Sequence, residues 1–145
     1  MIGLIQRVTQ ASVEVEGEKI ASISQGLLVL LGVEKGDDEV KANKLINKIL
    51  SYRVFEDEAG KMNLSLKDIH GELLLVPQFT LAADTNSGMR PSFSSAAEPA
   101  DASWWFDYVV KESKRVLAGA QAGRFGADMR VSLLNNGPVT FWLQT

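Results

Sequence analysis

The sequence predicts one α+β domain, residues 1–145, with a mostly antiparallel, barrel-like β-sheet and two main helices. Three observations lead to this fold class. A chain of 145 residues suits a single domain with a single core. Strand-like segments outnumber segments of helical spacing. They follow one another in the order strand, strand, strand, helix, strand, helix, strand, strand, which is typical of an α+β domain.

The first third of the chain is predicted to form a meander of three strands. Apolar residues alternate with polar ones in residues 1–8 and 12–17, and a continuous apolar run covers residues 26–33. A break near Thr9 and Gln10 separates the first two strands, and the glycines at positions 17 and 26 separate the second strand from the third.

Residues 36–53 are predicted to form the first helix. Acidic residues at positions 37–39 suit a helix N-terminus, where exposed amides and the dipole favour anions. The residues that follow helical spacing are Ala42, Leu45, Ile46, Ile49 and Arg53. A turn over residues 56–60 then leads through residues 61–66 to the next strand.

Residues 71–82 form the strongest strand candidate, because the segment is short, apolar and preceded by a turn signal. In a strand, Gln78 and Thr80 would point to one face and Phe79 to the other. On a core-facing side, Gln78 and Thr80 would need hydrogen-bond partners; composition favours the other interpretation, that they lie on the wet face of a half-exposed sheet. Pro77 cannot donate to the ladder, so we expect an edge or a bulge there, with free backbone amides at the disturbed strand end.

The last third contains a long connection, a helix and a closing pair of strands. Residues 83–99 show little periodicity, and loops of this length usually have a function. Pro99 suits a first helical position, Trp104 and Trp105 are predicted core or interface anchors, and residues 127–145 are expected to form two strands about a turn. The predicted inner face of the helix comprises Trp105, Tyr108, Val109, Glu112 and Val116.

Strands this apolar would leave a sticky edge if they were exposed, so we expect a homodimer that buries the edge. No apolar run is long enough to span a membrane, and polar Gln6 and Arg7 interrupt the stretch that a signal peptide would need. A cytoplasmic location is expected. The net charge of −3 argues against a protein that coats nucleic acid by bulk attraction. The lysines at positions 41, 44 and 48 share a helix face, which is either solvated or in contact with phosphates.

The residue inventory excludes several kinds of catalytic site. The chain has no cysteine, and its only histidine, His70, lies in a predicted turn, so neither a thiol nucleophile nor a serine-histidine-aspartate triad is expected. Phosphate-loop, dinucleotide and nucleophile-elbow motifs are missing from the sequence. No metal and no cofactor are predicted, although Asp84 and Asp128 remain possible hydrogen-bond or magnesium partners. An enzyme with this inventory would rely little on acid-base side chains.

Six segments, in order and at this length, resemble the bacterial D-aminoacyl-tRNA deacylase family, also called D-tyrosyl-tRNA(Tyr) deacylase. They are "MIGLIQRV", "GLLVLLGVEKGD", "KMNLSL", "PQFTLAADT", "GMRPSFS" and "NNGPVTFWLQ". The resemblance covers essentially the whole chain. The two most specific motifs are "PQFTL", residues 77–81, and "NNGPVT", residues 135–140.

The resemblance implies a homodimer that cleaves the ester between a D-amino acid and the 3'-terminal adenosine of tRNA. Glycyl-tRNA(Ala) is implied as a related substrate. It also implies that Gly137-Pro138 is a cis bond that enters the pocket of the partner subunit and excludes L-amino acids by steric rejection. The 2'-hydroxyl of the RNA would assist the reaction.

The catalytic roles implied by the resemblance fall on residues 78–80. The backbone N–H groups of Phe79 and Thr80 would stabilise the oxyanion, and the side chains of Gln78 and Thr80 would position the substrate. Thr80 as a nucleophile is the rival interpretation, but no base lies near it in the sequence.

Three further residues receive supporting roles from the resemblance. Arg7 would brace the Gly-Pro turn, or it is an ordinary surface arginine. Phe125 would stack on the adenosine, or it packs in the core. Pro77 stands where serine is usual in the family, which removes any role for a hydroxyl or an N–H at that position.

Two other functions stay open at the level of sequence. One is a catalytically silent RNA-binding or chaperone-like dimer, which the proline at position 77 and the lack of an acid-base group would suit. The other is a purely structural dimer in which Gly137-Pro138 only turns the chain.

Overall fold

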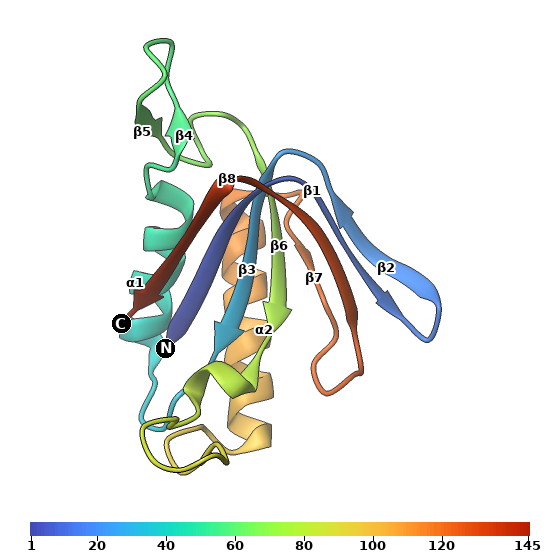
Figure 1. Cartoon of the computed structure of the whole chain (residues 1–145), viewed down its shortest axis with the longest axis vertical. Helices are drawn as coiled ribbons and strands as arrows, with labels where there is room; N and C mark the ends of the chain where they lie inside the picture. Colours follow the sequence, from blue (N-terminus) through green and yellow to red (C-terminus); the bar gives the residue numbers. More distant parts are fainter.

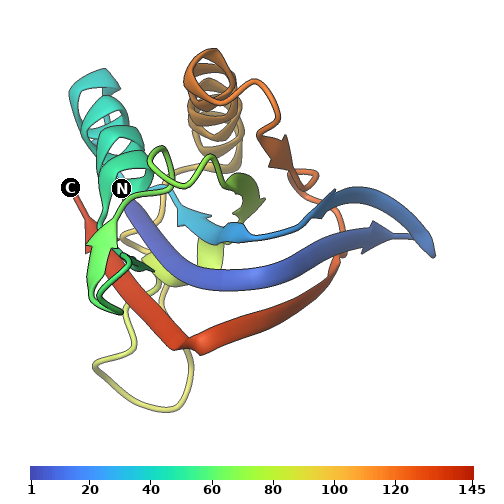
Figure 2. The same cartoon turned by 90° about the horizontal axis from the view of Figure 1, so that it is seen from above.

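The computed structural model describes residues 1–145. Its main sheet curls into a nearly closed barrel, and both long helices lie on the same side of it, as Figure 1 and Figure 2 show. Four of the six strand pairings are antiparallel and two are parallel. No helix is long and apolar enough to cross a membrane. The predicted fold class is confirmed.

The curled sheet contains six strands: β1 (Ile2–Val15), β2 (Glu18–Ile23), β3 (Gly26–Gly32), β6 (Glu72–Pro77), β7 (Gln121–Ala122) and β8 (Arg130–Gln144). A small separate hairpin joins β4 (Phe55–Glu56) to β5 (Met62–Leu64). The helices are α1 (Glu39–Ser51) and α2 (Pro99–Val116), with a short 3₁₀ helix, η1, over Phe79–Ala82.

The expected break near Thr9 and Gln10 is wrong, because residues 2–15 form the single strand β1. The first half of β1 pairs with β3 and the second half with β2, while β8 pairs with both halves on the other side. The break in apolar pattern therefore marks a change of neighbour and not the end of a strand. The sequence prediction also missed β2, which forms a hairpin with the second half of β1.

The closing segment was predicted as two strands about a turn, and this is also wrong. Residues 130–144 form one strand, β8, which pairs with β1 from Arg130 to Gln144. The Gly137-Pro138 bond is cis and lies within β8, where the register between the two strands is irregular. Because β1 continues on both sides of this irregularity, it holds both halves of β8 in one sheet.

The strand predicted over residues 71–82 ends early, at Pro77, and the chain continues as η1. Its pairing with β3 stops at Leu31 and Pro77, and its pairing with β7 stops at Ala122. Neither neighbour offers a ladder beyond Pro77, so the prediction that Gln78 and Thr80 alternate on a strand is wrong.

The helices cover the sheet with apolar faces. Asp38 caps α1 by accepting a hydrogen bond from the Lys41 N–H at 2.9 Å, which agrees with the predicted acidic N-terminus. In α2 Val109 is buried as predicted, and Trp105 and Tyr108 are partly buried and pack against the core, whereas Val116 is exposed. Trp104 is 59% exposed. The fully buried residues of α2 are Ala102, Phe106, Val109 and Ser113, and the small Ala102 and Ser113 give little apolar signal in the sequence.

Strands β3 and β6 are buried on both faces, as their continuous apolar runs indicate. Leu73 and Leu75 of β6 belong to the larger core cluster, which includes the helices. Leu74 and Val76 belong to a second cluster inside the curl of β1 and β2. The C-terminal end of β6 therefore lies between two packed layers, which fixes the segment that follows it.

Candidate functional site

The segment after β6 carries the predicted catalytic residues. The N–H of Gln78 donates to the carbonyl oxygen of Leu31 at 2.7 Å, which continues the parallel pairing by one hydrogen bond. The side-chain Nε2 of Gln78 donates to Oγ1 of Thr80 at 2.5 Å. Phe79 and Thr80 are the first two residues of η1, where amides have no acceptor inside the helix.

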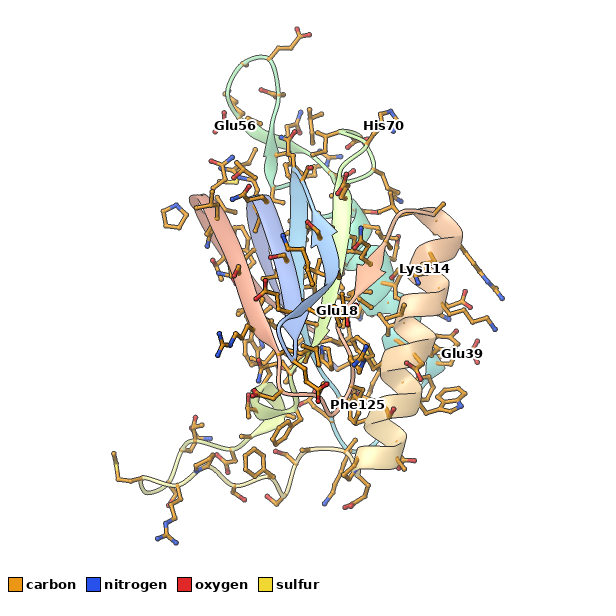
Figure 3. The ribbon with its side chains drawn as sticks, turned by 90° about the vertical axis from the view of Figure 1, so that its right-hand side faces the viewer. Glu18, Glu39, Glu56, His70, Lys114 and Phe125 are labelled. Carbon is orange, nitrogen blue, oxygen red and sulfur yellow. The ribbon has the colours of Figure 1, made fainter.

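A cavity of about 410 Å³ opens beside this segment. Its size falls within the range of small-molecule sites. The lining residues come from the end of β6 and the start of η1, from the start of α2 and the segment before it, and from the start of β8 and the segment before it. They are Val76, Pro77, Gln78, Phe79, Ala97, Pro99, Ala102, Phe125, Gly126, Ala127, Met129 and Val131. Four predicted site residues thus meet in one mainly apolar cavity, and Figure 3 shows one of them, Phe125, at the end of the sheet beside α2.

None of the twelve lining residues has an ionisable side chain. The side chain of Thr80 forms one hydrogen bond, with the side chain of Gln78. No carboxylate or histidine forms a hydrogen bond with it. The single histidine, His70, is exposed in the turn before β6, at the other end of that strand. No group of three His, Cys, Asp or Glu residues could hold a metal ion. The cavity can therefore act on a ligand through shape, amides and neutral polar groups.

One wall of the cavity follows a simple alternation that the sequence prediction missed. Phe125, Ala127, Met129 and Val131 line the cavity at every second position, and Gly126 lines it as well. The sulfur of Met129 accepts a hydrogen bond from the Arg124 N–H at 3.4 Å, which closes the loop that carries Phe125. A period of two in this stretch is the signal that would have found Met129.

Pro77 is accommodated without loss of a ladder hydrogen bond. Successive N–H groups of a strand point to opposite neighbours, and the Gln78 N–H points to β3. Position 77 therefore faces the β7 side, where β7 has already ended at Ala122. A proline fits at such a strand end, as predicted for an edge position.

Gly137-Pro138 lies away from the cavity, in a separate region with polar neighbours. Arg7, only 7% exposed, donates from Nε to the carbonyl oxygen of Asn136 at 2.9 Å and from Nη1 to that of Val54 at 2.7 Å. Arg7 is thus not a surface arginine.

Asn135 also spans this motif, and the sequence prediction did not single it out. Its Oδ1 accepts from the Val139 N–H at 2.9 Å, and its Nδ2 donates to Oγ1 of Thr140 at 2.8 Å. The side chain therefore links the residues on either side of Gly137-Pro138. An amide side chain two residues before a Gly-Pro pair is the sequence signal for these hydrogen bonds across the pair.

The sheet register separates the two motifs within one chain. Asn135 pairs with Val8, which lies level with Gly26 of β3 and Glu72 of β6. The cavity lies at the other end of β6, at Pro77, five residues further along the strand. Thr140, on the other side of the Gly-Pro pair, pairs with Gln6, which lies level with Leu74, three residues from Pro77. At about 3.3 Å per residue the pair is thus about 10–16 Å from Pro77 along the strand, so one chain does not bring its Gly-Pro pair to its own cavity.

Comparisons with known proteins place the chain among deacylases. A family model described as D-Tyr-tRNA(Tyr) deacylase matches residues 4–144. Proteins named D-aminoacyl-tRNA deacylase from Aeromonas hydrophila and Escherichia coli are each 60% identical over 99% of both chains, and one from Pseudomonas putida is 61% identical over the same share.

Two solved structures share the fold. A c-Myc DNA unwinding element binding protein superposes with a TM-score of 0.96 at 38% identity, covering 100% of this chain and 99% of its own. A probable eukaryotic D-amino acid tRNA deacylase superposes with a TM-score of 0.82 at 13% identity, covering 99% of this chain and 98% of its own.

Proposed function

The chain belongs to the D-Tyr-tRNA(Tyr) deacylase family, and we propose that it hydrolyses the ester between a D-amino acid and the 3'-terminal adenosine of tRNA in the cytoplasm. The observation that carries this proposal is the cavity at the end of β6. It joins the residues of one family motif to Phe125, and no ionisable side chain lines it.

The proposed reaction depends on amides and on the substrate itself. The N–H groups of Phe79 and Thr80 stabilise the oxyanion that forms when the ester carbonyl is attacked. The side chains of Gln78 and Thr80, which are hydrogen-bonded to each other, hold the ester in place. The 2'-hydroxyl of the terminal ribose, adjacent to the ester, supplies the assistance that no protein side chain offers. Thr80 as a nucleophile ranks second, because no base bonds to it.

The apolar part of the cavity accepts the adenosine. Phe125 and Met129 offer flat or polarisable surfaces against which a purine can stack. The hydrogen-bonding edge of the stacked purine can then reach the backbone groups at the end of β6. This assigns the base to one side of the cavity and the ester to the side of η1.

Selectivity comes from a second copy of the chain. Since one chain keeps its Gly137-Pro138 about 10–16 Å from its own cavity along the strand, we propose a homodimer in which each copy inserts this pair into the cavity of the other. Arg7 and Asn135 hold the pair in a fixed shape through the hydrogen bonds described above.

A rigid wall of backbone at this place explains the proposed substrate range. An L-amino acid held by its amine and carbonyl would drive its side chain into the wall, whereas the side chain of a D-residue points away. Glycine has no side chain to clash, so glycyl-tRNA(Ala) is a further proposed substrate. Exclusion of one direction, without a grip on any particular side chain, gives broad acceptance of D-amino acids.

The direct test compares D-Tyr-tRNA, L-Tyr-tRNA and Gly-tRNA(Ala) at substoichiometric protein. We expect loss of the D-ester and the glycyl ester while the L-ester remains. Dimerisation is tested separately by analytical ultracentrifugation. Hydrolysis of all three esters at similar rates would contradict the exclusion mechanism.

A second candidate is a nucleic-acid-binding dimer without turnover, and the 38% identical DNA unwinding element binding protein favours it. It predicts that all three esters survive while the protein still binds RNA or DNA in a mobility-shift experiment. The acidic net charge of −3 counts against strong bulk attraction to nucleic acid.

A further inference from the structure

The helix η1 holds the two amides of the proposed oxyanion site, but four residues cannot fix their own position. A 3₁₀ helix of this length is stable only through its surroundings. Its attachments therefore decide where the amides of Phe79 and Thr80 lie.

Two of the attachments use the end of β3. The Gln78 N–H binds the Leu31 carbonyl oxygen at 2.7 Å at the start of η1. Gly32 then lets η1 lie against the strand, since a Cβ there would be 3.0 Å from Cβ of Leu81 and 3.3 Å from the carbonyl oxygen of Gln78. The hydrogen bond holds the start of η1, and the close approach of Gly32 reaches Leu81, its third residue.

The third attachment is a side chain at the other end. The hydroxyl of Ser95 donates to the carbonyl oxygen of Ala82, the last residue of η1, at 2.5 Å. Ala82 is only 4% exposed, and carbonyls at the end of a helix lack donors within the helix. Apart from the neighbouring Gln78, Ser95 is the only residue whose side chain forms a hydrogen bond with η1.

Ser95 is itself fixed to the segment after β3. Its carbonyl oxygen accepts a hydrogen bond from the Lys35 N–H at 3.0 Å. Two residues further on, the Ala97 N–H donates to the Val33 carbonyl oxygen at 3.1 Å. Ser95 therefore connects the segment after β3, through a short and well-anchored piece of chain, to the C-terminal end of η1.

We infer that Ser95 is a positioning residue for the deacylation, acting through the Ala82 carbonyl on the amides of Phe79 and Thr80. This inference rests on the proposed function. Loss of the hydroxyl leaves a buried carbonyl without its donor, and η1 then adjusts to reach water. The adjustment moves the oxyanion donors without altering the surfaces that receive the adenosine.

The experiment compares Ser95→Ala, Ser95→Thr and Ser94→Ala with the wild type on D-Tyr-tRNA. Ser94 is the matched control, because it lies in the same loop and hydrogen-bonds only to Ser92. Displacements of about 1 Å can cost about a hundredfold in rate, so we expect Ser95→Ala to lower kcat about tenfold. KM should change less than about twofold. Ser95→Thr keeps the hydroxyl and should restore kcat, and Ser94→Ala should match the wild type.

Hydrogen exchange of the peptide that covers residues 78–83 gives a readout independent of activity. We expect faster exchange in Ser95→Ala and wild-type exchange in Ser94→Ala. Unchanged kcat in Ser95→Ala, equal losses in both alanine variants, or a loss of kcat without faster exchange would each overturn the inference. If the wild type leaves D-Tyr-tRNA intact, the proposed function fails, and the exchange comparison alone decides whether Ser95 holds η1.

Discussion

Arg7 and Asn136 are joined by a hydrogen bond of 2.9 Å from the guanidinium Nε to the backbone carbonyl oxygen, beside the Gly137-Pro138 pair. The same guanidinium donates to the carbonyl oxygen of Val54 at 2.7 Å. A planar group with several donors at fixed angles can satisfy both carbonyls at once. Arg7 thereby links the middle of β8 to the chain that follows α1.

Replacing Arg7 by lysine should destabilise the protein, because one ammonium group cannot reach both carbonyls in this geometry. We expect a loss of about 1–3 kcal/mol in the free energy of unfolding, the cost of a buried carbonyl without a partner. Urea denaturation measures it. Arg53→Lys is the control, since Arg53 is exposed and bonds only to Asn63 at 3.2 Å. A loss of similar size in the control would show that Arg7 has no special role.

Gly137→Ala should impair the Gly-Pro wall directly. Gly137 has a φ of +138°, and an added Cβ would lie 2.6 Å from Cγ2 of Val139 and 3.1 Å from Nη2 of Arg7. We expect about 1–3 kcal/mol of strain and a smaller ratio of D-ester to L-ester hydrolysis. The matched control is Gly119→Ala, where an added Cβ meets nothing within 4 Å. An unchanged ratio in a folded, dimeric Gly137→Ala variant would argue for the purely structural dimer.

Gln78→Ala and Thr80→Ala test the proposed positioning pair. Each change removes one partner of the same hydrogen bond, so their effects on kcat should overlap and not add. We expect a drop of about tenfold to a hundredfold in each single variant, measured as single-turnover hydrolysis of D-Tyr-tRNA. If neither variant changes the lifetime of the ester, the reaction takes place elsewhere on the protein.

Phe125→Leu tests the stacking surface for adenosine. Leucine keeps the wall apolar but removes the aromatic face, which is worth about 1–3 kcal/mol per stacked base. KM for D-Tyr-tRNA should therefore rise by about fivefold or more, with kcat little changed. Trp104→Leu serves as the control, because Trp104 is an exposed aromatic residue outside the cavity. Equal KM values for Phe125→Leu and the wild type would assign Phe125 to packing alone.

Stability should fall in acid partly through Glu34. Burial acts to raise the pKa of Glu34, but hydrogen bonds from the Met1 ammonium and from Gln144, together with the charge of the ammonium, lower it below 4.5. A lowered folded-state pKa means that the stabilisation is complete above the unfolded-state value and is lost as pH falls through the folded-state value. Below about pH 4.5 the free energy of unfolding should decline more steeply in the wild type than in Glu34→Gln.

Thermal unfolding of the wild type and of Glu34→Gln, measured between about pH 6 and about pH 3, checks this difference. This interval covers roughly the range over which carboxylates titrate. Glu58→Gln is the control, since Glu58 is exposed and forms no ion pair. Parallel pH curves for the wild type and Glu34→Gln would remove Glu34 from the acid response.

The sequence was a good guide to the elements whose pattern is local. Helix α1 buries Ala42, Leu45, Ile46 and Ile49 as their spacing predicts, and the apolar runs at β3 and β6 lie inside the sheet. The predicted extension of α1 to Arg53 is wrong, because the helix ends at Ser51 and Arg53 is exposed. Partner choice is not local, which is why β1 and β8 were each divided in two. A period of two identifies a strand, but only the neighbouring strand decides whether a bend interrupts it.

The site shows the same limit. Residues 77–80 and 125 were identified in the sequence, and the structure brings Pro77, Gln78, Phe79 and Phe125 to one cavity. The strand predicted for Thr80 is a 3₁₀ helix, because pairing with β7 ends at Leu75 and pairing with β3 ends at Pro77. Met129 belongs to a row of alternating residues that the sequence prediction overlooked. Ser95 lies more than a dozen residues from residues 77–80, and its contact with Ala82 depends on the fold and not on any local pattern.

The pairing of β1 with β8 also has a consequence for how the protein is made. Ile2 pairs with Gln144, so one edge of strand β1 stays unpaired until the residues of β8 have been synthesised. Contacts between the two ends of a chain slow folding, since a large loop must close before they form. During synthesis β1 would present an open strand edge until β8 leaves the ribosome, which makes this the stage at which the nascent chain is most exposed to aggregation and to chaperone binding.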